Sequence, residues 1–502
     1  MTAPETLVLV AYFFVLSILG IYGWHRYYLV YQYMKNKDRK PGPPPEVSDE
    51  DLPLVTIQLP IYNEMYVVDR LVDSVCRIDY PREKLQIQIL DDSTDETCDI
   101  AKLAVQRHSS RGFDISYHHR TDRTGFKAGA LEAGLKTATG EFVAIFDADF
   151  VPPSDFLRRT VPYFTVNEKL AVVQARWGHL NHDYSALTRI QAILLDGHFV
   201  LEHGARNRSG CFFNFNGTSG VWRKTAIADG GGWQHDTLTE DLDLSYRTQL
   251  RGWQFLFLPD LVTPAEVPVE MNAFKSRQHR WAKGSIQTCR KVLPYLLQSN
   301  LPLKVKVEAF FHLTANFNYL LMVVLSILMW PAMYVRYSMG WTEMLLIDVP
   351  LFAAATLSVF NFYLISQRET YSDWRTRALY LPMVMAVGIG LAVNNSKAVI
   401  EAMMGHTSEF ARTPKYGIRA NGDGWRNKKY HQALPIQPFI EVGLGLYFTG
   451  AVFYALQHDI YGTLPFLVLF QVGFLYTGLL SIFQQIGGDD LLVKAPQIAS
   501  GK

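Results

Sequence analysis

The chain has 502 residues, of which 49% are hydrophobic and 13% aromatic, and its 48 basic and 47 acidic side chains leave a formal net charge of +1. The aromatic content excludes a disordered chain, and the near-neutral charge argues against nucleic acid as a partner. The 4 cysteines lie far apart and form no CxxC pair, which excludes a disulfide scaffold and a thiolate zinc site and fits a reducing compartment. The length allows two or three domains.

An apolar segment opens the chain. Residues 6–24 carry no charge and are about as long as one membrane crossing. A secretory signal peptide is the alternative, but no basic segment precedes the run and no small-residue cleavage site follows it. Basic residues between His25 and Lys40 come next, so the positive-inside tendency places the start of the chain outside and the following segment in the cytoplasm.

Between residues 53 and 300, strand-like runs alternate with helical ones. This alternation predicts an α/β domain with a parallel sheet, in which ligands bind at the carboxyl ends of the strands. The expected strands are 54–64, 85–95 and 141–152, and the expected helices are 66–78, 95–108 and 126–138.

Acidic residues follow two of these strands. Asp147 and Asp149, in the run FDADF, come after the third strand. Two carboxylates at this spacing can bind a hard cation that bridges a diphosphate, although an ordinary acidic turn is the alternative. Asp91 and Asp92 end the second strand; alone they would more often cap the next helix, but beside a metal site Asp92 would contact a nucleotide.

Two further motifs contain candidate catalytic or phosphate-binding groups. RTGFKAGAL (123–131) opens a helix with Gly125 and Lys127, a combination that suits phosphate, whereas a solvated basic turn is the alternative. Glu240 and Asp241 precede an amphipathic helix, where they either cap it or supply a general base.

A basic and aromatic cluster precedes the second apolar half. KSRQHRWAKGS (275–285) brings Arg277, His279, Arg280 and Trp281 together. A basic amphipathic helix on lipid headgroups would have the same composition. Both interpretations can hold, because the stretch directly precedes the membrane half.

Beyond residue 300 the chain becomes apolar again. The clustering of the apolar runs indicates membrane spans rather than isolated core helices. These runs are 309–335, 349–366, 378–394, 442–457 and 460–488.

The charges between the runs set the expected topology. Basic loops at 367–377 and 405–435 flank the run at 378–394 on both sides, so both flanks should be cytoplasmic. We therefore expect 378–404 to be re-entrant or to lie along the cytoplasmic interface. Five true spans remain, with the carboxyl terminus inside.

The ordered motifs resemble the family 2 processive membrane glycosyltransferases, which include cellulose synthase. The motifs are Asp92, DAD at 147–149, TED at 239–241 and RQHRW at 277–281. The runs FDADF, VQARW, FFNFNGTSGVWR and QHRW are most similar to the cellulose-synthase-like A and C proteins of plants and their bacterial relatives. Those proteins are mannan, glucomannan and β-glucan synthases.

The resemblance continues into the membrane half and shows two departures. EFARTPK (409–415) is similar to the family's FxVTxK gating loop through Phe410, Thr413 and Lys415, but Arg412 replaces the usual Val. Arg277 replaces the first Gln of the family's QxxRW box, as in ceramide glucosyltransferase-type enzymes. This change would either keep a polar contact with the acceptor or the diphosphate, or favour a single transfer to a lipid.

The resemblance implies a cytosolic α/β glycosyltransferase domain of the GT-A type, with a Rossmann-like mixed sheet, joined to an α-helical transmembrane domain. The implied reaction is inverting transfer from UDP-glucose or GDP-mannose to a growing β-glycan, which is then translocated. One alternative is a glycolipid-forming enzyme that acts on diacylglycerol, ceramide or a polyprenyl phosphate. Another class, a transporter with a nucleotide-sensing domain, would be expected to show internal repeats, and the sequence shows none.

The resemblance also implies the roles of individual residues. Asp241, with Glu240 beside it, would be the catalytic base, and Asp149 with Asp147 would hold Mg²⁺ or Mn²⁺. The nucleotide sugar would be bound by Tyr62, Glu64, Asp92, Lys127, Asp147, Arg280 and Lys415, and the acceptor by Trp281, Asn216, Gly217, His279 and Arg277.

Polar residues inside the expected spans have two interpretations. They either make hydrogen bonds between helices or line a channel for the glycan. They are Thr314, Asn316, Asn318 and Gln471, with the aromatic residues Tyr319 and Trp330.

The expected partners are the nucleotide sugar, a glycan or lipid acceptor and membrane lipid, while no protein partner can be named. The membrane would be the inner or plasma membrane of a bacterium, or the Golgi of a eukaryote, with the catalytic domain in the cytoplasm. In chain order we expect a transmembrane helix (1–30), a basic, proline-rich linker (31–52), a catalytic domain (53–270), interfacial helices (271–305), transmembrane and re-entrant helices (306–404), a gating-like cytosolic loop (405–435), two transmembrane helices (436–488) and a cytosolic tail (489–502).

Overall fold

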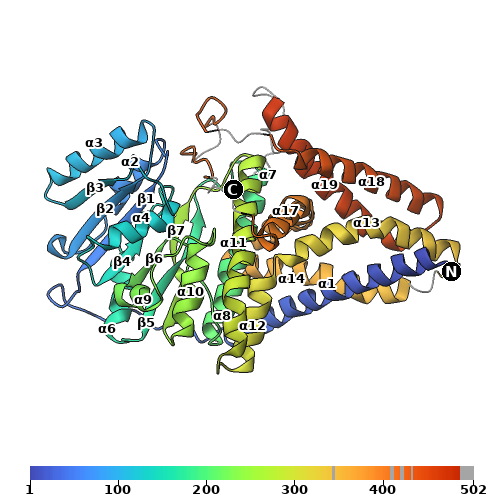
Figure 1. Cartoon of the computed structure of the whole chain (residues 1–502), viewed down its shortest axis with the longest axis horizontal. Helices are drawn as coiled ribbons and strands as arrows, with labels where there is room; N and C mark the ends of the chain where they lie inside the picture. The colour runs from blue at the N-terminus through green and yellow to red at the C-terminus, as the bar shows by residue number, and fades with distance from the viewer. Residues whose placement is uncertain (342–344, 407–411, 419–422, 431–433, 487–502) are drawn as a thin grey trace.

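The computed structural model describes residues 1–341, 345–406, 412–418, 423–430 and 434–486. A mixed sheet with its covering helices forms one end of the molecule, and long helices form the other (Figure 1). Helices α11 (Met271–Gln298) and α12 (Leu303–Thr314) stand between the two parts.

The sheet has seven strands in the order β3-β2-β1-β4-β6-β5-β7. The first four are parallel, β6 is antiparallel to both of its neighbours, and β7 is parallel to β5. The α/β class and the mixed sheet are therefore confirmed. The strands are β1 (Val55–Ile61), β2 (Leu85–Asp91), β3 (Asp114–His119), β4 (Phe142–Ile145), β5 (Leu170–His179), β6 (Gly220–Arg223) and β7 (Gln254–Ala265).

Both faces of the sheet are buried, which explains why its parallel strands are continuous apolar runs. On β4, Phe142 and Ala144 belong to one core cluster, and Val143 and Ile145 to another. Helices α2 and α3 contribute to the first cluster and α4 and α9 to the second. Strand β4 ends at Ile145, earlier than expected, so that the acidic residues that follow lie in a turn at the sheet edge.

The helices of this part are short. They are α2 (Val68–Val75), α3 (Thr97–Ser109), α4 (Phe126–Leu135), α5 (Phe156–Thr160), α6 (Pro162–Thr165), α7 (Ala186–Asp196), α8 (Gly204–Arg208), α9 (Lys224–Asp229) and α10 (Glu240–Leu250), with a 3₁₀ turn η1 (Arg82–Lys84) and a π-helix η2 (Gly197–His203).

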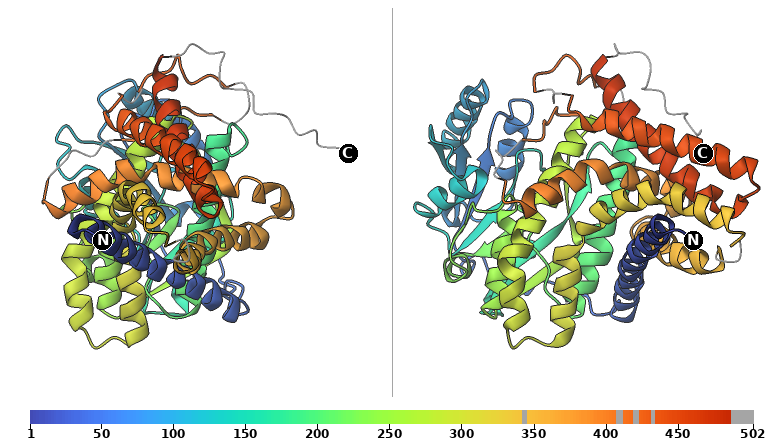
Figure 2. Two further views of the ribbon diagram at one scale, coloured as in Figure 1. Left: turned by 90° about the vertical axis from the view of Figure 1, so that its right-hand side faces the viewer. Right: turned by 45° about the vertical axis from the view of Figure 1, so that its right-hand side comes forward.

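Among the described residues, five helices are long and apolar enough to cross a membrane, and they lie where five spans are expected. Gly23 of the first packs directly on the backbone of Ala354 in another, because a Cβ there would lie 2.3 Å from the carbonyl oxygen. Figure 2 shows these helices extending away from the sheet. They are α1 (Ala3–Lys35), α13 (Phe317–Ser338), α14 (Leu345–Thr370), α18 (Gln437–Gln457) and α19 (Leu464–Ile486), which begins after the 3₁₀ turn η4 (Tyr461–Thr463).

Several boundaries differ from the expected ones. Helix α1 continues to Lys35, past residue 30. The apolar run at 309–335 is divided, because α12 ends at Thr314 and the span α13 begins only at Phe317.

The segment expected to be re-entrant or interfacial contains three helices, α15 (Trp374–Ala378), α16 (Leu381–Gly390) and α17 (Ala392–Met403). Helices α15 and α16 together form one segment, and α17 forms a second. Only the two segments combined are long and apolar enough to cross a membrane, and they are bent by 40° relative to each other. A break of this kind is found in broken spans and in re-entrant loops alike, so the re-entrant or interfacial placement stays a prediction.

A buried polar network ties α11 to the last two spans. Lys275 Nζ lies 2.5 Å from Glu441 Oε2 of α18 and 2.7 Å from Ser481 Oγ of α19. Asn272 Nδ2 donates to the main-chain oxygen of Ser481 at 3.3 Å. The position of α11 is thereby linked to that of the spans.

Candidate active site

A cleft of about 180 Å³ opens at the carboxyl ends of β1, β2 and β4. It collects side chains from β-strand ends, from the N-termini of α4 and α10, from α11 and from residues 412–415. Of the residues predicted from the sequence, it is lined by Tyr62, Glu64, Asp92, Lys127, Asp147, Asp149, Asn216, Gly217, Glu240, Asp241, Arg277, Arg280, Trp281 and Lys415.

His279 is not among the cleft residues. Its Nε2 lies 3.3 Å from Glu401 Oε2 on α17. Arg280 and Trp281, one and two positions along α11, line the cleft, and each step along a helix turns the side chain by about 100°. The predicted acceptor contact of His279 is thus replaced by a contact between α11 and α17.

Asp147 and Asp149 lie in a turn that is fixed from several sides. The Asp147 N–H donates to Thr218 Oγ1 at 2.9 Å, and Arg70 donates to the Asp149 carbonyl at 3.2 Å. Their carboxylates face the two lysines of the cleft: Lys127 Nζ is 2.5 Å from Asp147 Oδ1, and Lys415 Nζ is 2.5 Å from Asp149 Oδ2.

This donor set fits a divalent cation. Each carboxylate is paired with a flexible lysine side chain. Carboxylate oxygens at this spacing are the ligands that Mg²⁺ and Mn²⁺ prefer. The two ion pairs would also form in an ordinary acidic turn, so the metal site stays a prediction.

Asp92 is buried, with 5% of its surface exposed, and makes a bidentate pair with Arg120 at 2.8 and 2.5 Å. The pair joins the ends of the neighbouring strands β2 and β3. The helix-cap alternative for Asp92 is wrong, because α3 begins only at Thr97, whose N–H donates to Asp95 Oδ1 at 3.0 Å.

Aromatic and charged groups form the wall next to Asp92. The Arg123 guanidinium lies 3.4 Å from the centre of the Tyr62 ring. Glu64 accepts from Arg412 Nε at 3.3 Å, and burial raises the pKa of Glu64 to about 7. The planar Arg123 guanidinium and the Glu64 carboxyl group therefore lie at the end of the cleft where Asp92 is found.

Asp241 is the second residue of α10, and its Oδ1 accepts the N–H of Leu242 at 2.8 Å. Burial raises the pKa of Asp241 to about 7, with the neighbouring Glu240 carboxylate as the next cause. Burial also raises the pKa of Glu240. Asp241 thus accepts one N–H of the first turn of α10, whose N-cap is Thr239, and its carboxyl group with a near-neutral pKa also suits a general base.

Gly217 lies between Asp241 and Lys127. Its φ of +77° belongs to the left-handed region that favours glycine, and a Cβ at this position would lie 3.0 Å from Asp241 Oδ2 and 3.3 Å from Lys127 Nζ. The Gly217 carbonyl accepts from Lys127 Nζ at 2.9 Å. The glycine therefore keeps the space between base and lysine open.

Trp281 lies close to two flat side chains, those of Arg277 and Trp177. The Arg277 guanidinium lies 4.8 Å from the centre of the Trp281 ring and donates to Gln191 Oε1 at 2.9 Å. The ring centres of Trp281 and Trp177 are 6.4 Å apart. Burial lowers the pKa of Arg277 to about 9. Arg277, which stands where the family has Gln, thus stabilises the position of Trp281 by a cation–π contact.

A second cavity, of about 320 Å³, shares Asp241, Trp281 and Asn216 with the cleft and continues toward the long helices. Polar and aromatic groups from η2, α12, α13, α14 and the break before α13 line much of it: His198, Glu202, His312, Asn316, Tyr319 and Tyr363.

The polar residues expected inside the spans divide between the two interpretations. Asn316 and Tyr319 line the second cavity. Thr314 and Gln471 instead make interhelical hydrogen bonds, with Tyr22 at 2.7 Å and Thr449 at 2.8 Å.

The loop that resembles a gating loop is described from Arg412 onward, and Phe410 lies outside the described residues. Thr413 and Lys415 line the cleft.

Sequence reasoning missed several residues of the site. Arg123 is the first residue of the RTGFK motif and Arg120 lies three residues before it, so their position was an available signal. Trp177 lies in the VQARW run, where only its resemblance was noted. Glu266 had no signal, because its role depends on a segment about 150 residues away.

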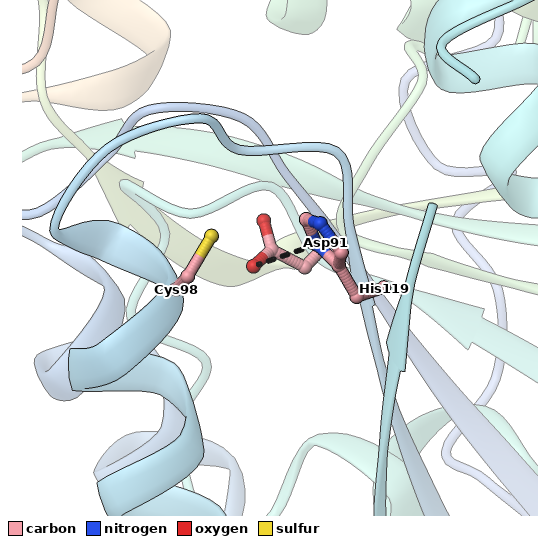
Figure 3. A group of neighbouring side chains, drawn as sticks. All are labelled: Asp91, Cys98 and His119. Carbon is pink, nitrogen blue, oxygen red and sulfur yellow. Dashed lines mark ion pairs between the residues drawn. The ribbon is translucent and has the colours of Figure 1, made fainter. Parts of the chain in front are cut away.

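One further group of potential metal ligands occurs among the described residues, Asp91, Cys98 and His119 (Figure 3). Asp91 already accepts the N–H of Ser93 at 2.8 Å and the hydroxyl of Tyr117 at 2.6 Å. Both of its oxygens therefore have donors, and the group holds the end of β2 next to Asp92.

The sequence is similar to known glycosyltransferases. Residues 53–284 match the family model described as "Glycosyltransferase like family 2". Glucomannan 4-beta-mannosyltransferase 1 of Oryza sativa subsp. japonica is 40% identical over 284 residues, which cover 56% of this chain and 54% of the relative. Glucomannan 4-beta-mannosyltransferase 2 of Arabidopsis thaliana is 42% identical over 280 residues, covering 54% and 52%. The chain thus spans about half the length of the curated relatives it matches.

A solved structure shares the fold. The mannosyltransferase PcManGT of Pyrobaculum calidifontis, in complex with GDP-Man and Mn²⁺, superposes with a TM-score of 0.50 at 19% identity, covering 78% of this chain and 99% of that one. Residues 53–284, which supply most of the cleft, thus match a family 2 glycosyltransferase domain and are attached to helices long enough to cross a membrane.

Proposed function

We propose that the protein transfers a hexosyl group from a nucleotide sugar to a β-linked polysaccharide, with inversion, and passes the product toward the membrane half. One observation carries the proposal: Asp241 and Trp281 line both cavities. The proposed base therefore lies where the donor cleft meets a second cavity that continues toward the long helices.

In the proposed reaction, Asp241 takes the proton of the acceptor hydroxyl while the diphosphate leaves from the opposite face of the sugar. Its raised pKa makes it a stronger base than an exposed carboxylate. Trp281 presents a flat apolar surface to the acceptor ring. Gly217 leaves room for the acceptor beside the base.

The leaving diphosphate gains negative charge, and the cleft offers cations placed in advance. Lys127, Arg280 and Lys415 all line it. A Mg²⁺ or Mn²⁺ held by Asp147 and Asp149 would neutralise the charge that develops on the diphosphate. The Asp92–Arg120 pair and Tyr62 would hold the nucleoside.

The donor is GDP-mannose or UDP-glucose. The relatives named above are mannosyltransferases, so GDP-mannose is the first donor to test. We further propose that the domain faces the cytoplasm, where nucleotide sugars are made, because the basic loops lie on its side of the spans.

A glycolipid product is the competing proposal, since Arg277 departs from the polymerase motif. In support of the polymer, the second cavity contains His198, Glu202 and Asn316, which suit the hydroxyl groups of a glycan, although most of its wall is apolar.

The test uses membrane vesicles that contain the protein, with Mn²⁺ or Mg²⁺ and radiolabelled GDP-mannose or UDP-glucose in separate tubes. The proposal predicts label in an ethanol-insoluble glycan that a β-mannanase or β-glucanase destroys. Label only in the chloroform phase, with one sugar per lipid, would overturn it. Asp241→Asn should abolish incorporation, and the vesicles with this variant serve as the control.

A further inference from the structure

Residues 412–418 supply Arg412, Thr413 and Lys415 to the wall of the cleft, although they lie far in sequence from the sheet. They are held there by Glu266, which directly follows β7 and is 2% exposed. One carboxylate oxygen of Glu266 accepts the N–H of Tyr416 at 2.9 Å, and the other accepts the N–H of Gly417 at 2.8 Å. The carbonyl of Glu266 accepts from Lys415 Nζ at 3.1 Å.

These bonds fix two successive peptide units. Gly417 has a φ of +69°, and a Cβ there would lie 3.0 Å from the carbonyl oxygen of Tyr66, so the backbone also packs closely on the sheet domain. Hydrogen bonds to a buried carboxylate are stronger than those between neutral groups. The side chain of Lys415 leaves the backbone one residue before this fixed point and reaches Asp149 Oδ2.

Other contacts hold neighbouring side chains of the same region. Arg412 pairs with Glu64 at 3.3 Å, and Lys428 donates to the Tyr416 carbonyl at 2.5 Å. The N–H groups of Tyr416 and Gly417, in contrast, use the Glu266 carboxylate as their acceptor.

We infer that Glu266 is a positioning residue for the transfer reaction, which seats residues 415–417 so that the Lys415 ammonium is aimed at Asp149. The cation that it aims would contact the diphosphate of the donor. The kinetic part of this inference rests on the proposed function, while the structural part does not.

The structural part is tested by hydrogen–deuterium exchange of the full-length protein in lipid nanodiscs, without donor. Glu266→Gln leaves one acceptor oxygen and turns an amide donor toward the other N–H. Exchange in the peptide that covers 412–418 should rise about tenfold, because two protected amides lose a charged acceptor. Peptides from β1 and β2 should not change, which shows that the domain stays folded.

Tyr416→Phe is the matched control. It removes the hydroxyl that contacts Glu270 but keeps both N–H bonds to Glu266. Its exchange over 412–418 should equal that of the wild type. Unchanged exchange in Glu266→Gln would overturn the inference.

The kinetic part is tested by a double-mutant cycle with the donor that the vesicle assay identifies. Glu266→Gln should lower kcat/KM about tenfold in the wild-type background and less than about twofold in Lys415→Met, because coupled residues are not additive. Equal effects in both backgrounds would show that Glu266 acts independently of Lys415 and would overturn the role. If the wild type transfers neither sugar, the proposed function fails, and the exchange result still decides whether Glu266 seats the segment.

Discussion

At the scale of single residues, the open space between Gly217 and Asp241 would control access to the proposed base. The left-handed backbone of Gly217 and its distance from Asp241 impose two separate demands, one conformational and one steric. Gly210 meets only the conformational demand: its φ is +71°, and a Cβ there meets nothing within 4 Å.

The pair Gly217→Ala and Gly210→Ala separates the two demands. Each should cost about 1–2 kcal/mol of stability, since both place a Cβ in the left-handed region. Only Gly217→Ala should also lower kcat, by about tenfold or more, because its methyl group presses on Asp241 and Lys127. Thermal unfolding and single-turnover transfer measure the two effects, and equal loss of activity in both variants would contradict the steric argument.

The raised pKa of Asp241 has a consequence for the pH profile. The base works as a carboxylate, so kcat/KM should fall as the pH drops through about 7, the pKa of the buried group. Removing the neighbouring charge with Glu240→Gln lowers the pKa of Asp241 and should move this acidic limb to lower pH. A limb that stays in place in Glu240→Gln would show that another group titrates.

At the scale of elements, α11 connects the cleft with the spans. Its Lys275 end is embedded between α18 and α19, and Arg277, Arg280 and Trp281 line the cleft within the next two turns. The Lys275 and Glu441 side chains are 2% and 0% exposed, so the pair is desolvated.

Removing one partner of this pair should destabilise the protein more than replacing both partners by apolar residues. Lys275→Met leaves the Glu441 charge buried and unpaired, which costs about 3–5 kcal/mol, whereas Lys275→Met with Glu441→Leu should regain most of that loss. Thermal unfolding in detergent measures both variants. A double variant no more stable than Lys275→Met would contradict the charge argument.

The same scale shows what the sequence could and could not reveal. Buried parallel strands are uninterrupted apolar runs, so β1, β2 and β4 and the carboxylates after them were recognisable. Strand β6 has only four residues and pairs between β4 and β5, and nothing in GVWR announces antiparallel partners so distant in sequence. The Asp92–Arg120 pair could not be predicted without knowing that β2 and β3 are neighbours in the sheet.

The orientation of His279 was missed for another reason. A family motif gives the residue types of α11 but not the rotation of the helix against α17. The break between α12 and α13 was hidden because an average over the apolar run at 309–335 conceals the polar residues around Asn316.

At the scale of the whole molecule, the two cavities share lining residues, and in the proposed reaction they would form one route whose width limits the product that can pass. Gly388 of α16 lines the second cavity, and a Cβ there meets nothing within 4 Å. Gly388→Trp should fill the cavity, shorten the glycan and leave donor binding unchanged. Gly443 of α18 also has open space at its Cβ but does not line the cavity, so Gly443→Trp is the control.

Product length by gel filtration, with the Kd of the nucleotide sugar, measures both properties. Full-length glycan from Gly388→Trp would contradict the proposed route.

The cleft is also nearly balanced in charge. Among the residues that line it, seven are acidic and six are basic: Glu64, Asp92, Asp147, Asp149, Glu240, Asp241 and Glu266 against Arg123, Lys127, Arg277, Arg280, Arg412 and Lys415. A diphosphate and a divalent cation cancel each other's charge, so the proposed donor and its metal would enter together as an almost neutral unit and would displace the lysines from their carboxylates. Binding becomes an exchange of ionic partners, in which the Kd of the metal-loaded donor changes less than about twofold from low to high salt.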